Sequence, residues 1–246
     1  MTLAIRGDRA SCLSLQLGPQ TWLLAVARGF GYVGGVPVEA ALLGRVRAEC
    51  ERRGRSARFR RAIDSPQAAA TALLAILTRV NGDLYTFTAS HEDYVTAAAS
   101  FTAVLVVQGR AYVVQAGSTA AYLARAGEIV ALSEDDVFDD RPSPLLYRAL
   151  GVGPALDVTV SSTTLLFGDA IVLVERRARG VAERAALIAQ LEAANPGEHV
   201  LIARFERDEG VQYQSPAPRT LEIVLGPALI RAAAAIAFLA AAVCTH

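Results

Sequence analysis

The sequence is poor in the residues that build disulfide frameworks, zinc sites and nucleophile motifs. Its three cysteines, Cys12, Cys50 and Cys244, lie far apart and form no Cys-x-x-Cys pair, so neither a disulfide framework nor a zinc site is indicated. The three histidines show no metal-ligand spacing, and no serine or cysteine lies in a nucleophile motif. The N-terminus carries charges where a signal peptide would need an apolar core, so we expect a cytoplasmic protein in a reducing environment.

The chain also lacks lysine and any excess of charge, because all 24 basic residues are arginine and they balance 24 acidic residues. A net charge of zero gives no global reason to expect binding to nucleic acid or to an anionic membrane surface. Charge gathers locally in a basic stretch, Glu49–Arg61, and an acidic stretch, Glu134–Asp140. The first could attract phosphate or an acidic partner and the second a cation. Without interleaved aromatics or EF-hand spacing, however, we expect both to be solvated.

An apolar run from Trp22 to Ala27 predicts a buried strand, and it leads into Arg28 and then into four closely spaced glycines. Glycine allows positive φ angles and a close approach of the backbone to a ligand. The stretch therefore predicts a strand that delivers a turn to the edge of a binding site.

The rest of the pattern alternates between helical and extended segments. Helices are expected at 38–53, 66–80 and 181–194, and strands at 11–17, 22–27, 101–107, 111–116, 121–125, 129–132, 156–166, 170–174 and 200–205. Residues 145–150 are expected to form one or two helical turns. Short turns between consecutive strands predict antiparallel sheets, with the helices outside them.

Three segments resemble the metal-dependent protein phosphatases, the PPM or type 2C family. They are Gln108–Leu132, Tyr147–Gly151 and Phe167–Val174, and the stretch from Trp22 to Gly35, with its Arg28-Gly-Phe-Gly-Tyr-Val-Gly-Gly35 turn, is a fourth. The resemblance runs from about residue 5 to residue 205. It implies the α+β fold of that family, a four-layer α-β-β-α sandwich in which two antiparallel sheets pack between helices.

The resemblance also implies where metal ligands would lie. In the family, aspartates hold two divalent cations that activate a water for attack on a phosphoserine or phosphothreonine. The corresponding positions here are Arg9, Arg28, Arg176 and Glu198, and Ser118 replaces an aspartate of the meander turn. A one-residue shift would place Asp8 at the first position. Because arginine cannot coordinate a cation, we expect no metal, no cofactor, no catalytic residue and no enzymatic activity, as in a pseudophosphatase.

Two interpretations of the arginines follow. Arg9, Arg28 and Arg176, with the amides of Gly29 and Gly31, would form an anion or phosphate site. Alternatively, the arginines pair with nearby carboxylates, for which the candidates are Glu92, Asp169, Glu175 and Glu198. We expect a binding or regulatory module of bacterial signalling that recognises a phosphorylated or acidic protein partner, and no nucleic acid. The alternatives are a residual Ser/Thr phosphatase and a structural subunit of a membrane-associated complex.

The chain divides into a phosphatase-like domain at 1–205, a polar linker at 206–219 and an apolar C-terminal helix at 220–246. Between Ile223 and Cys244 only Arg231 is charged, and about 20 apolar residues suffice to cross a bilayer. We expect this helix either to anchor the domain to the inner face of the cell membrane or to dock on protein.

Overall fold

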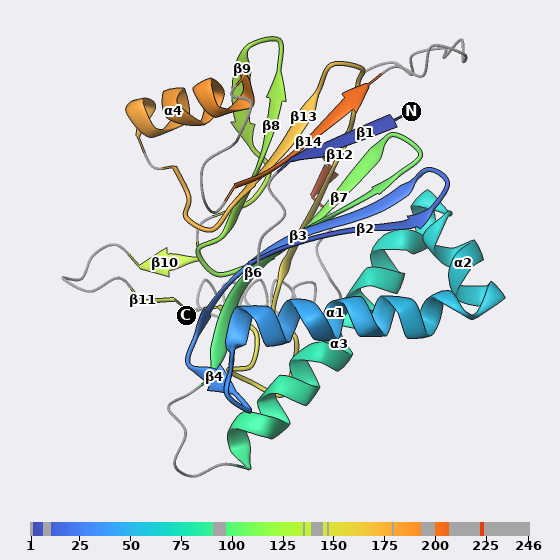
Figure 1. Cartoon of the computed structure of the whole chain (residues 1–246), viewed down its shortest axis with the longest axis vertical. Coiled ribbons are helices and arrows are strands. Elements are labelled where there is room, and N and C mark those ends of the chain that lie inside the picture. The colour runs from blue at the N-terminus through green and yellow to red at the C-terminus, as the bar shows by residue number, and fades with distance from the viewer. Residues whose placement is uncertain are drawn as a thin grey trace, which may run out of the picture.

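Two antiparallel sheets pack face to face, with helices on their outer faces (Figure 1). The computed structural model describes residues 2–6, 11–90, 97–134, 136–138, 145–146, 148–178, 180–192, 200–206 and 222–223. One sheet has the order β15-β12-β7-β6-β3-β2 and the other the order β1-β14-β13-β8-β9, and every pairing in them is antiparallel. This arrangement confirms the expected α+β class with antiparallel sheets flanked by helices.

The strands of the six-stranded sheet are β2 (Cys12–Gly18), β3 (Thr21–Phe30), β6 (Ala98–Val107), β7 (Arg110–Ala116), β12 (Thr159–Thr164) and β15 (Glu222–Ile223). Those of the five-stranded sheet are β1 (Thr2–Arg6), β8 (Ala120–Arg125), β9 (Glu128–Ala131), β13 (Ala170–Val174) and β14 (Val200–Glu206). Two small ladders join β4 (Tyr32–Val33) to β5 (Val36–Pro37), and β10 (Val137–Phe138) to β11 (Leu145–Leu146).

Helices cover the outer face of each sheet. The helices α1 (Val38–Gly54), α2 (Ala57–Ile63) and α3 (Pro66–Ala89) lie against the six-stranded sheet, and α4 (Val181–Glu192) lies beside the five-stranded one (Figure 1). Side chains alternate along each strand, so one face of β3 meets the helices and the other meets the second sheet. Leu23 and Ala25 belong to the first core, and Leu24 and Val26 to the core between the sheets.

Two local expectations, at β11 and at the end of α3, were wrong. Residues Leu145–Leu146 form strand β11 rather than a helical turn, because they pair with β10. Helix α3 continues past Val80 to Ala89 because the buried Asn81 side chain accepts a hydrogen bond from the Gly151 amide (2.9 Å) and donates one to the Gly153 carbonyl (3.0 Å). Asn81 was expected to end the helix, but its side-chain amide forms tertiary hydrogen bonds to a distant loop instead.

The basic stretch forms the end of α1 and most of α2, a helix that was not predicted. Its arginines are largely occupied locally. Arg52 and Arg53 bond to the buried Glu49, and Arg60 donates to the Gly54 (2.9 Å) and Arg55 (3.2 Å) carbonyls. Carbonyls at a helix end lack partners within the helix, so these contacts stabilise the α1 terminus.

Most of the predicted linker and C-terminal helix lies outside the described residues. The exceptions are Glu206, the last residue of β14, and Glu222–Ile223, which form strand β15 on β12. Among the helices in the described ranges, none is long and apolar enough to cross a membrane. The division at residues 205 and 219 stays a prediction.

Candidate functional site

The core between the sheets becomes polar at one end. Along β3 and β6 the residues that face the other sheet are apolar, and then they change to Arg28 on β3 and to Thr102 and Ser100 on β6. Arg28 lies directly opposite Ser100 in the ladder, and cross-strand partners share a face. We call this the polar end of the sandwich.

The turn that carries the chain from β7 to β8 crosses the polar end and brings Ser118 to it. The Ser118 amide donates to Ser100 Oγ (3.1 Å), and the two hydroxyls lie 3.3 Å apart. Gly117 has a φ of 91°, and a Cβ at this position would lie 2.3 Å from Ser100 Oγ. Only glycine therefore fits here, and its absence of a side chain lets Ser118 approach β6.

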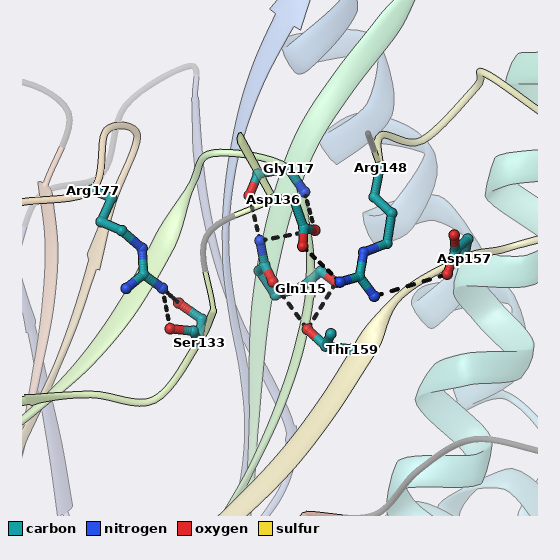
Figure 2. A network of polar contacts seen from close by, with 8 residues as sticks. All are labelled: Gln115, Gly117, Ser133, Asp136, Arg148, Asp157, Thr159 and Arg177. Atoms are coloured by element: carbon teal, nitrogen blue, oxygen red, sulfur yellow. Dashed lines mark hydrogen bonds and ion pairs between the residues drawn. The ribbon is translucent and has the colours of Figure 1, made fainter. Parts of the chain in front are cut away.

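A buried carboxylate holds this turn from the other side (Figure 2). Asp136 has no exposed surface, and it accepts a hydrogen bond from the Gly117 amide (2.9 Å). Its other oxygen forms an ion pair with Arg148 (2.8 Å). The prediction that the acidic stretch is solvated is wrong for Asp136, because the turn amide and the arginine replace its contacts with water.

Gln115 connects this pair to β12. Its Nε2 donates to Asp136 (3.3 Å) and to the Gly117 carbonyl, while its Oε1 accepts from Thr159 Oγ1 (2.9 Å), as Figure 2 shows. The sequence could have pointed to Arg148 through its place in the Tyr147–Gly151 segment, which resembles a family motif. No sequence spacing indicated Asp136 or Gln115.

Arg28 is half-buried at the polar end, with its guanidinium carbon 6.0 Å from the centre of the Phe30 ring. It has no ion pair with any carboxylate that the structure describes. One proposed partner is already engaged, because Asp169 bonds to Arg125 through both of its oxygens (2.9 and 2.7 Å). Glu92 and Glu198 lie outside the described residues.

The second predicted arginine, which follows the Phe167–Val174 segment, behaves differently. Arg176 follows β13, at the same end of the sheets as Ser118, because Val174 pairs with Ala120 at the start of β8. Its side chain is exposed. The next residue, Arg177, turns inward and donates to the Ser133 carbonyl and to Ser133 Oγ (3.3 Å), as Figure 2 shows. Arg9 and Glu198 lie outside the described part of the chain.

The glycines have packing roles that the sequence did not indicate. A Cβ on Gly29 would lie 2.6 Å from the Glu39 amide nitrogen, so this glycine allows α1 to begin directly against β3. Gly31 has a φ of 86°, and its carbonyl accepts a hydrogen bond from the Val38 amide (3.2 Å). Both residues therefore position the start of α1 beside Arg28.

The described residues of the polar end do not fit a divalent metal. No group of three or more histidine, cysteine, aspartate or glutamate side chains with metal-binding geometry occurs among them. Hard cations require anionic oxygen ligands. The described groups at this end include the Arg28 and Arg176 cations, neutral hydroxyls, the Glu175 carboxylate after β13, and Asp136, whose charge Arg148 balances.

Comparison with known proteins identifies the architecture. No family model and no curated protein sequence matches the chain. Solved structures match it, among them the S. agalactiae serine/threonine phosphatase, with a TM-score of 0.61 at 14% identity over 83% of this chain and 100% of that one. PppA, a regulatory component of the T6SS in Pseudomonas aeruginosa, also has a TM-score of 0.61, at 19% identity over 82% and 96% of the two chains.

A third match is the Mycobacterium tuberculosis serine/threonine phosphatase PstP/Ppp, with a TM-score of 0.57 at 21% identity over 84% of this chain and 99% of that one. The chain has the type 2C phosphatase fold. The resemblance seen in the sequence is thereby confirmed at the level of the fold.

This comparison contradicts the expectation that the chain is not an enzyme. Two of the three matched structures are serine/threonine phosphatases by description, and they share nearly their whole length with the chain. The expectation rested on residues aligned with metal-binding aspartates, of which Arg9 and Glu198 lie outside the described residues. The type 2C fold of this chain is therefore shared with enzymes.

Proposed function

We propose that this type 2C-fold protein binds a phosphorylated or acidic segment of a partner protein at its polar end, and acts in bacterial phosphosignalling. The observation that carries the proposal is Arg28. It is a half-buried cation at the end of the core between the sheets, without a carboxylate partner among the described residues.

Physical chemistry favours an anion at this position. A guanidinium that is partly removed from water loses hydration, and a bound anion restores that loss. Phosphate and carboxylate groups match the donor fork of arginine, and charge-assisted hydrogen bonds to them are stronger than neutral ones. The partly exposed Ser118 hydroxyl offers a further donor, and it lies 3.3 Å from the hydroxyl of Ser100, the cross-strand neighbour of Arg28.

Calorimetry with a panel of phosphoserine and phosphothreonine peptides, each with its unphosphorylated counterpart, tests the proposal. We expect phosphorylation to tighten binding about tenfold or more, and Arg28→Gln to remove most of that gain, which corresponds to about 1.4 kcal/mol or more. Arg47→Gln, which removes an exposed arginine of α1, is the matched control and should change nothing. Equal binding of both peptide forms, or an unaltered gain in Arg28→Gln, would refute the proposal.

The comparisons favour a second candidate, a serine/threonine phosphatase. The same phosphopeptides, incubated with Mn²⁺, provide the assay. Release of phosphate that EDTA abolishes would establish this function, whereas binding without release would support recognition alone. A chain that neither binds nor hydrolyses the peptides, but co-purifies with a membrane complex, would instead be a structural subunit.

We further propose that the protein works in the cytoplasm, attached to the inner face of the cell membrane by residues 223–244. The support is compositional, because only Arg231 is charged in that segment. Attachment would concentrate the domain near membrane-bound partners.

A further inference from the structure

Two half-buried donors, Arg28 and Ser118, flank the buried Ser100 at the polar end. Arg28 lies directly opposite Ser100 in the ladder between β3 and β6, and the Cβ atoms of such cross-strand partners are about 4.5–5.5 Å apart. Ser118 Oγ lies 3.3 Å from Ser100 Oγ. Ser100 has no exposed surface, whereas Arg28 and Ser118 both retain partial contact with water. A ligand that reaches the guanidinium from solvent can therefore also meet the Ser118 hydroxyl.

Ser100 determines the direction of the Ser118 hydroxyl. Ser100 Oγ accepts a hydrogen bond from the Ser118 amide (3.1 Å), and its own hydrogen requires an acceptor, because a buried donor without one is costly. In the part of the chain that the structure describes, the acceptor within reach of Ser100 Oγ is Ser118 Oγ. The Ser100 hydroxyl therefore donates to Ser118, and Ser118 keeps its own hydrogen for a ligand.

The turn that carries Ser118 is held on both sides. The Gly117 amide donates to the fully buried Asp136 (2.9 Å), and Arg148 pairs with the same carboxylate (2.8 Å). On the other side the Ser118 amide is bonded to Ser100. The Ser118 hydroxyl is thus in place before a ligand arrives, so little conformational entropy is lost in ordering it on binding.

A single donor next to an arginine distinguishes phosphate from carboxylate. A carboxylate has two oxygens, and a guanidinium binds both of them in a bidentate pair. A phosphate monoester has three terminal oxygens, so one of them is left for another donor when two bind the guanidinium. The Ser118 hydroxyl supplies that donor, and a carboxylate bound in the same way offers it no further oxygen.

We infer that Ser118 is a specificity-determining residue, whose hydroxyl donates to the third oxygen of a phosphoserine or phosphothreonine, and that Ser100 is the residue that positions it. This inference rests on the proposed function. It narrows the ligand from a phosphorylated or acidic segment to a phosphorylated one, because Arg28 attracts either anion and Ser118 favours phosphate.

One peptide in three forms, with phosphoserine, glutamate or serine at the same position, tests the inference on the full chain by fluorescence polarisation. A phosphate also carries more charge than a carboxylate, so the informative quantity is the change that each variant causes. Ser118→Ala should weaken binding of the phosphoserine form about tenfold, as expected for the loss of a hydrogen bond to a charged group. Binding of the glutamate form should change less than about twofold. Ser56→Ala, at an exposed serine before α2, is the matched control and should change neither.

A double-mutant cycle tests the positioning role of Ser100. Ser100→Ala should weaken binding of the phosphoserine form about threefold to tenfold in the otherwise unmodified chain. In the Ser118→Ala background the same substitution should have no further effect, because Ser100 acts through the Ser118 hydroxyl. A loss of equal size in both backgrounds would show that Ser100 does not act through Ser118 and would overturn this role.

The outcomes separate this inference from the proposed function. If phosphorylation tightens binding and Arg28→Gln removes the gain, but Ser118→Ala affects the phosphoserine and glutamate forms equally or affects neither, the inference is wrong and the proposed function stands. If the phosphoserine and serine forms bind equally well to the unmodified chain, both are wrong.

Discussion

At the scale of single residues, Asp136 controls the geometry of the polar end. Its carboxylate fixes the Gly117 amide and the Arg148 guanidinium at once. Removing one member of a buried ion pair leaves the other charge without compensation. Asp136→Ala should therefore lower the free energy of unfolding by about 3–5 kcal/mol, as measured by urea denaturation at neutral pH.

Asp157 provides the matched control for this change. It also faces Arg148, at 4.0 Å, but its side chain is 71% exposed. Exposed ion pairs contribute little, so Asp157→Ala should alter the stability by less than about 1 kcal/mol. Equal effects of the two substitutions would show that the buried pair does not stabilise the fold.

The same residue shows a limit of inference from sequence. Asp136 is one of four aspartates in a short acidic stretch, and composition alone favours a solvated loop. The burial of Asp136 depends on the register of β9 and on the turn after β7, two segments that are brought together only by tertiary structure. Arg28, by contrast, was expected directly after its strand because a long apolar run precedes it, but it lies within β3, which continues to Phe30.

At the scale of elements, α1 contains a pH-sensitive cluster. The hydrogen bond from Arg52, aided by Arg53, lowers the pKa of Glu49 from 4.5 to about 2, although burial opposes this shift. Because the folded-state pKa lies below the ordinary value, ionised Glu49 contributes stability above pH 4.5, and the contribution is lost as the pH falls from about 4.5 towards 2.

Glu49→Gln should therefore lower the free energy of unfolding by about 1.5–3 kcal/mol at pH 7, the range for hydrogen bonds to charged groups. The difference from the unmodified chain should shrink as the pH falls below 4.5. Thermal melts between pH 7 and pH 2.5 measure it. Glu51→Gln, at an exposed position on the same helix, should produce no such pH-dependent difference. A deficit in Glu49→Gln that stays constant across this range would contradict the assignment.

Elements were predictable where the local signal and the tertiary environment agree. The strands of the meander were found because apolar runs alternate with turns at Gly109 and Gly127, whose φ angles are positive. The end of α3 was misplaced because Asn81, which usually disfavours helix interiors, is bonded to a distant loop. Propensity describes isolated segments, and a tertiary hydrogen bond overrides it.

At the scale of the whole molecule, the polar end arises from topology. Antiparallel pairing sets Arg28 beside Ser100, and the turn after β7 carries Ser118 from one sheet to the other. The resemblance to the type 2C phosphatases predicted that Arg9, Arg28 and Arg176 converge, and it did not indicate Ser100. The direction of each arginine was not predictable, because neighbouring residues after β13 point differently, with Arg176 exposed and Arg177 turned inward.

The C-terminal segment allows a test of membrane attachment for the molecule as a whole. Residues 223–244 are long enough to cross a bilayer, and Arg231 would cost roughly 2.5–3.5 kcal/mol at the centre of a membrane. We expect the full chain to sediment with membranes. A chain that ends at Gly226, which retains strand β15 on β12, should remain in the supernatant.

Two further variants sharpen this comparison. Arg231→Leu removes the charge, so it should make extraction of the full chain from the membrane harder. A chain that ends at Arg219 lacks β15, so a loss of stability relative to the chain that ends at Gly226 would report the contribution of that edge strand separately from attachment. If the full chain stays in the supernatant in the presence of lipid vesicles, and removal of residues 227–246 lowers its melting temperature, the segment docks on the domain and does not anchor it.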